Sequence, residues 1–196
     1  MKQIACVLLV IGLLLFSTGC SIKHVVANDY PQYLVNNAGS TQFPHTEYTA
    51  QYILTPNTIS HRLKFRAAST GLAHLWIVDF GKILEDTLES NDIQSAFKKL
   101  QKASGSGDLS GLVIKYNLIA YRFAGFEATV NLQVTVTKDG AVIMDKTYLE
   151  KGLGQRGKVA LTGVFGMKNA IQQSTKLAVD KILLQSLNDM KLIIDR

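Results

Sequence analysis

The segment Phe126-Glu127-Ala128-Thr129-Val130-Asn131-Leu132-Gln133-Val134-Thr135-Val136-Thr137-Lys138 alternates between apolar and polar residues. Successive side chains of a β-strand point to opposite faces of a sheet, so this alternation predicts a strand with one face in a core and one in water. Asp139-Gly140 predicts a tight hairpin turn, with the partner strand over 141–150. The sequence therefore predicts an antiparallel hairpin, with Leu132 at the centre of its apolar face.

The residues on either side of this hairpin predict further strands and several helices. Residues 47–54, 61–67 and 112–122 have strand patterns. Apolar residues at three- and four-residue steps predict helices over 71–88, 92–100 and 167–192. This order indicates an α+β fold in one domain, 47–196, with helices packed on one face of a mainly antiparallel sheet.

The N-terminus carries the pattern of an export signal. Lys2 precedes an apolar run over 4–16 that is too short for a confident membrane span, and small residues then lead to Cys20. The stretch Leu13-Leu14-Leu15-Phe16-Ser17-Thr18-Gly19-Cys20 resembles the lipobox of bacterial lipoproteins, although Ser17 stands where a leucine is usual. The resemblance implies a signal peptide over 1–19 and lipidation of Cys20. An uncleaved anchor and a plain secretory signal are the alternatives.

Residues 20–46 lack any sustained period and predict a flexible tether behind the lipid. Asn, Gln, Ser and Gly are mixed there with Pro31 and Pro44. A flexible coil of this length typically spans ~30 Å, so the domain could stand away from the membrane. Tyr30, Tyr33 and Phe43 nevertheless indicate that part of the segment lies on the domain.

Composition excludes several classes of protein. The formal charge is +6, and removal of Lys2 with the signal leaves +5. Cys6 leaves with the signal and Cys20 takes the lipid, so the mature chain has no internal disulfide and no thiolate metal cluster.

Arg62, Lys64 and Arg66 share one strand face, which is either solvated or in contact with an acidic partner or anionic headgroups.

No motif indicates catalysis, a metal or a cofactor. Gly152-Leu153-Gly154-Gln155-Arg156-Gly157 matches G-x-G-x-x-G, but the strand before it belongs to a hairpin and the helix is expected about ten residues later. The four histidines lack ligand spacing, and the carboxylates of Glu85, Asp86 and Glu89 are typical of a solvated helix face. We therefore predict a protein that is not an enzyme and has no metal site.

Residues 152–166 form a predicted loop with five glycines. Its apolar residues either fold back over the sheet edge or form an exposed patch. Arg156 and Lys158 lie beside apolar residues that include Phe165, a combination that suits a protein groove or an anionic lipid surface. We predict that Arg156, Lys158 and Phe165 bind a partner.

The mature domain resembles the auxiliary lipoproteins of ABC-type lipid-transport systems. The stretch 48–56, Trp76 followed by Ile83, Leu84 and Leu88, the strands within 116–148, and a closing helix with Phe165 and Ala170 are similar to this family. The resemblance implies a non-enzymatic accessory protein that faces the periplasm. Ser21, in place of an aspartate after the cysteine, favours the outer membrane. The expected function is docking within a transport or secretion assembly, and the alternative is a periplasmic module that binds a lipid or a glycan.

Overall fold

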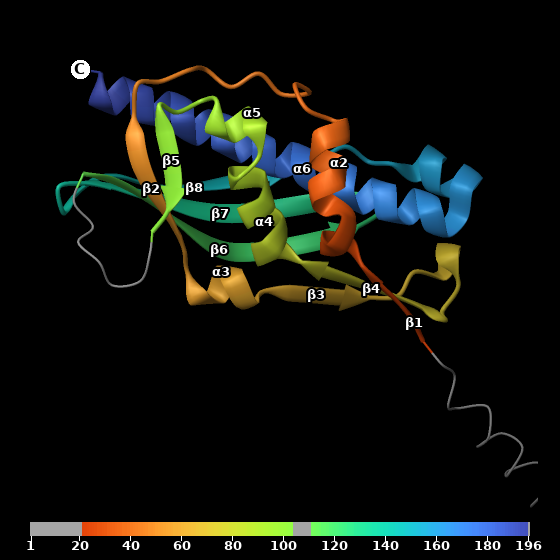
Figure 1. Cartoon of the computed structure of the whole chain (residues 1–196). Coiled ribbons are helices and arrows are strands. Elements are labelled where there is room, and N and C mark those ends of the chain that lie inside the picture. Colours follow the sequence, from red (N-terminus) through yellow and green to blue (C-terminus); the bar gives the residue numbers. More distant parts are fainter. Residues whose placement is uncertain (1–20, 104–110, 196) are drawn as a thin grey trace, which may run out of the picture.

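The computed structural model describes residues 21–103 and 111–195, apart from the side chains of 156–158, 160 and 161. It has two mixed sheets and a long C-terminal helix, α6 (Arg156–Ile194), which runs along the sheets in Figure 1. The α+β class is therefore confirmed. Cys20 and the signal lie outside the described residues.

The larger sheet has five strands in the order β5-β2-β6-β7-β8. Strands β6 (Leu112–Ala124), β7 (Glu127–Lys138) and β8 (Ala141–Lys151) form an antiparallel meander. Strand β2 (Thr49–Leu54) pairs with β6 in parallel, and β5 (Lys99–Lys102) pairs with β2 in parallel. The predicted antiparallel part is present, but the completed sheet is mixed.

Strand β7 has the two unlike faces that its alternation predicted. Its inward residues are completely buried: Ala128, Val130, Leu132, Val134 and Val136. On the other face, the Gln133 amide donates to Asp145 Oδ1 at 2.9 Å. Asp139 and Gly140 have φ values of 50° and 82°, the pair of positive angles that a type I′ turn requires.

The smaller sheet has three strands and corrects one predicted helix. It has the order β1-β4-β3, formed by β1 (Ile22–Val25), β4 (His74–Asp79) and β3 (Arg62–Phe65). We expected one helix over 71–88, but only α4 (Phe80–Leu88) is helical. The first half of that segment is β4, whose Trp76, Ile77 and Val78 are all buried. A short apolar run that is buried on both faces carries no period that separates strand from helix.

Two shorter stretches also differ from the prediction. The helix expected over 92–100 is only α5 (Asn91–Gln94), and the chain then enters the edge strand β5. The turn expected at 55–57 is a short helix, α3 (Pro56–Ser60), whose first turn is capped by the Thr55 side chain.

The segment predicted as a tether contributes part of the core. After β1 come a 3-10 turn, η1 (Val26–Asp29), and helix α2 (Tyr30–Asn36). Val26 and Tyr30 are completely buried, and the Tyr30 hydroxyl lies 3.3 Å from Thr87 Oγ1 of α4. The folded domain therefore includes residues 22–36 and is not limited to 47–196, because apolar side chains of this segment pack against partners far along the chain.

Candidate functional site

Strand β1 begins two residues after Cys20 and is tied to the domain from its first residue. The Ile22 amide donates to the Ala73 carbonyl at 2.9 Å, and β1 then pairs in parallel with β4 from Ile22↔His74 to Val25↔Ile77. In Figure 1, the start of β1 lies beside the start of β4. The end of the domain that carries this strand is therefore next to the predicted lipid site.

A stack of three aromatic rings joins β1 to β4. His24 Nε2 lies 2.8 Å from His74 Nδ1, and the His24 ring stacks on Trp76 with a centroid distance of 4.4 Å. Desolvation lowers the pKa of His24, and the charges of His74 and Lys168 act in the same direction. The stack fixes the short β1 strand against the buried Trp76.

The predicted glycine-rich loop is largely helical. Helix α6 already begins at Arg156, and its backbone departs from helical angles at Gly163, where φ is 56° and ψ is −124°. The prediction of a loop up to residue 166 is therefore wrong. Gly163 allows the break because a positive φ is costly for residues with a Cβ atom.

The apolar residues of this segment differ in their exposure. Val159 is buried, whereas Phe165 is 87% exposed and is the most exposed large apolar side chain among the described residues. The side chains of Arg156 and Lys158 lie outside the described part, so their predicted role stays a prediction.

Phe165 lies at the same end of the domain as β1. The Lys168 ammonium, one helical turn further along α6, forms an ion pair with Asp29 of η1. The Gln172 side-chain amide donates to the Val26 carbonyl at 3.4 Å, and α6 also contacts the 3-10 turn η2 (Ala68–Thr70) that precedes β4. Figure 1 shows the N-terminal part of α6, η2 and the start of β1 gathered at one end.

The G-x-G-x-x-G match has a structural explanation. Helix α6 begins within the motif, so the expected ten-residue gap is wrong, but β8 still pairs antiparallel with β7 and forms no βαβ unit. A Cβ atom on Gly152 would lie 2.0 Å from the Ser174 carbonyl oxygen. Ser174 Oγ also accepts from the Ala128 amide at 2.8 Å. Gly152 thus permits close contact between the sheet and α6.

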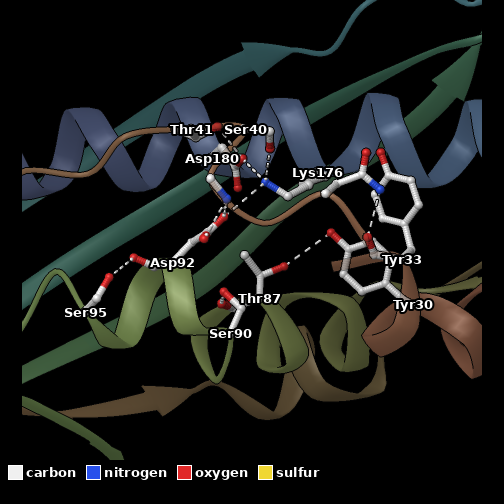
Figure 2. A network of polar contacts seen from close by, with 12 residues as sticks. Tyr30, Tyr33, Ser40, Thr41, Thr87, Ser90, Asp92, Ser95, Lys176 and Asp180 are labelled. Atoms are coloured by element: carbon white, nitrogen blue, oxygen red, sulfur yellow. Dashed lines mark hydrogen bonds and ion pairs between the residues drawn. The ribbon is translucent and has the colours of Figure 1, made fainter. Parts of the chain in front are cut away.

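A buried polar network clamps α6 to the connection that follows α2. Lys176 Nζ donates to Asp180 Oδ2 at 2.5 Å and to Ser40 Oγ at 3.0 Å, and Thr41 Oγ1 donates to the same Asp180 oxygen at 2.6 Å. Asp92 of α5 accepts from the Gly39 amide at 2.9 Å. Figure 2 shows these groups converging from three segments.

The charges in this network are almost fully removed from water. The side chains of Lys176 and Asp180 are only 6% and 3% exposed. Burial raises the pKa of Asp180, and the Lys176 cation opposes that rise. Because each charged group is hydrogen-bonded within the domain, the network positions α6. The sequence signal for it is the Lys-Asp pair at i and i+4 among buried positions of the last helix, which we had not singled out.

A surface pocket of 330 Å³ lies between α2 and the corner where α4 meets α5. Pro31, Leu34, Val35 and Ala38 form its apolar side, and Asp86, Glu89, Ser90, Asn91 and Asp92 form its polar side. The buried Asp86 pairs with Lys82 through one carboxylate oxygen, while its Oδ2 has no hydrogen-bond partner. Desolvation raises the pKa of Asp86. Of the three carboxylates predicted on a solvated helix face, only Asp86 is buried. Glu89 lines the pocket but is exposed, and Glu85 is half-buried and pairs with Lys102.

The described residues include no group of three or more His, Cys, Asp or Glu side chains placed to hold a metal ion. Nor does any described helix combine the length and the apolar character needed to cross a bilayer.

Comparisons with known proteins show a likeness of fold. No family model and no curated protein matches the chain. The crystal structure of protein XCC0632 from Xanthomonas campestris, which carries the family label DUF330, aligns with a TM-score of 0.52 and 12% identity over 79% of this chain and 91% of that one. The hypothetical protein CT253 from Chlamydia trachomatis aligns with a TM-score of 0.42 and 7% identity, over 72% of this chain and 96% of that one. This chain and XCC0632 therefore share a fold.

Proposed function

We propose that this chain is a non-enzymatic lipoprotein of the bacterial envelope, which acts as a docking component of a transport or secretion assembly. The observation that carries the proposal is the meeting of two features. A lipobox-like stretch ends at Cys20, and the folded domain begins at Ile22 with a strand that is hydrogen-bonded to β4. A lipid on Cys20 would thus hold the folded domain itself at the membrane.

The resemblance to the auxiliary lipoproteins of ABC-type transport systems supports the same function. That resemblance favours the periplasmic side of the outer membrane, and Ser21 after the cysteine agrees with it. Phe165 is the proposed contact residue, together with Arg156 and Lys158, which lie earlier in the same glycine-rich segment. An exposed aromatic side chain in a segment that also carries basic residues fits a protein groove or an anionic lipid surface.

The anchor is tested by replacing Cys20. We expect Cys20→Ser to give an unprocessed precursor or a soluble periplasmic product, whereas Cys6→Ser, a matched change within the signal, should leave a lipidated and membrane-bound protein. Intact mass spectrometry reads the lipid, and fractionation of the envelope reads the location. Because a single acyl chain binds a membrane only marginally, stable attachment needs the several chains that the lipoprotein resemblance implies. A signal-cleaved, membrane-bound Cys20→Ser protein would contradict the proposal.

A second candidate function is a periplasmic module that binds a glycan or a lipid. The pocket between α2 and the α4–α5 corner favours the glycan form, because its carboxylates accept hydrogen bonds from hydroxyl groups while its apolar side packs against a sugar ring. The gap between α6 and the sheet near Phe43 and Leu187 has a volume of only 10 Å³, too small for an acyl chain.

Native mass spectrometry after gentle purification separates the two functions. A co-purifying protein supports docking, and a small molecule bound at one copy per chain supports the ligand-binding module. Val35→Asp would place a charge on the apolar side of the pocket, and it should remove such a small molecule without weakening protein capture.

A further inference from the structure

The distance between the lipid site and the folded domain is limited by the chain itself. Cys20 and Ile22 are two residues apart, so their Cα atoms lie no more than about 7 Å from each other in any conformation. Ile22 is already held by the Ala73 carbonyl. The acyl chains of a lipidated Cys20 occupy the hydrocarbon layer, which keeps the backbone of this residue at the headgroups. A lipid on Cys20 would therefore leave only Ser21 between the lipidated residue and β1.

Three elements present apolar side chains at the end that this constraint brings to the membrane. Ile22 opens β1 and is 52% exposed, and Leu72, in the turn before β4, is 68% exposed. Because β1 and β4 are parallel, both strands begin at this end. Phe165, just after the break in α6, is 87% exposed. We call Ile22, Leu72 and Phe165 the apolar triad.

The charges at this end favour an anionic surface. Lys23 and Arg66 are exposed, and the Arg66 guanidinium donates to the Leu72 carbonyl, so it lies beside the triad. The acid of η1, Asp29, is already paired with Lys168 of α6. Positive side chains next to exposed apolar ones are the pattern of a protein surface that rests in the headgroup region of a membrane.

We propose that this end of the molecule lies on the bilayer that holds the Cys20 lipid, with the apolar triad inserted among the headgroups. The proposal rests on the lipid anchor of the proposed function and adds a defined orientation of the domain. It assigns the exposed Phe165 to a lipid surface rather than to a protein groove. The pocket beside α2 and α5 is lined by none of the triad residues, so insertion of the triad would not occupy it.

The orientation can be tested with a fluorophore on single cysteines. The mature chain has no other free thiol once Cys20 is lipidated, so Phe165→Cys and Leu72→Cys can each be labelled selectively. Leu192→Cys is the matched control, because Leu192 is 62% exposed near the opposite end of the same helix as Phe165. Each lipidated protein is reconstituted into vesicles of phosphatidylethanolamine and phosphatidylglycerol without any other protein.

We expect spin-labelled lipids to quench the fluorophore at positions 165 and 72 several-fold, while aqueous iodide quenches it only at 192. If the fluorophores at 165 and 72 are as open to iodide as the one at 192, the orientation is wrong. Protection at 165 that arises only after an envelope extract is added would identify a protein groove instead and would also overturn the inference. Intact mass spectrometry of the same samples reads the lipid independently. Absence of the lipid would overturn the anchor, whereas a lipidated protein without protection at 165 would overturn only the orientation.

Discussion

Replacement of Lys176 by methionine is the sharpest test of how the last helix is held. The change keeps the length of the side chain and removes the charge that Asp180 and Asp92 share, at 2.5 Å and 4.0 Å. Asp180 then stays buried and keeps the hydrogen bond from the Thr41 hydroxyl. Loss of one partner of a buried ion pair costs about 3–5 kcal/mol, a large part of the 5–15 kcal/mol that stabilises a typical domain.

Urea unfolding measures this loss through the fluorescence of Trp76, the single tryptophan, which is completely buried. Lys98→Met is the matched control on an exposed residue and should change the free energy of unfolding by less than about 0.5 kcal/mol. The double variant Lys176→Met/Asp180→Asn should lose less than the sum of its two single changes, since the residues are coupled. A loss in Lys176→Met no larger than that in Lys98→Met would refute the buried pair.

The pH dependence of this variant gives a second test. Burial already raises the pKa of Asp180 above 3.8, and removal of the Lys176 cation removes the group that opposes this rise. The folded state then holds the Asp180 proton more tightly than the unfolded chain does. We therefore expect Lys176→Met to be closest to the parent protein at low pH and to lose stability as the pH rises through the folded pKa of Asp180.

Two further predictions concern the sheet and the histidine stack. Leu132→Ala should lower the free energy of unfolding by about 2–5 kcal/mol, because Leu132 is completely buried. Gln133→Ala should lower it by less than about 1 kcal/mol, because water can replace the hydrogen bonds of its side chain. Equal losses in urea unfolding would contradict the one-sided sheet. The pKa of His24 is lowered below 6.5 by desolvation and by the charges of His74 and Lys168, so its contribution to stability is present above pH 6.5 and is lost as the pH falls through the lowered pKa. Urea midpoints measured from pH 7.5 to pH 5 should fall less in His24→Gln than in the parent protein, and an unchanged slope would show that His24 does not cause it.

The sequence by itself determined the features that depend on neighbouring residues. Alternation over 126–138 and the Asp139-Gly140 turn predicted the central hairpin, because the two faces of a strand and the angles of a tight turn are local properties. The predicted inward face, including Leu132, is the face that the structure buries. The lipobox-like stretch is also a pattern of neighbouring residues, and the export signal stays a prediction.

Only the tertiary structure decided which N-terminal residues join the folded domain and which side chains lie at the end that carries β1. Residues 22–36 have no period of their own, and they are ordered because β1 pairs with β4 and Tyr30 packs beside Thr87, more than 50 residues away along the chain. The Lys176–Asp180–Thr41 network could not be predicted from the sequence for the same reason, since Thr41 and Asp180 are 139 residues apart in the chain. Periodicity reports which face of an element is apolar, but the partner of that face is set by packing over the whole chain. A segment that had the composition of a linker therefore forms a strand, and that strand places the domain beside the predicted lipid site.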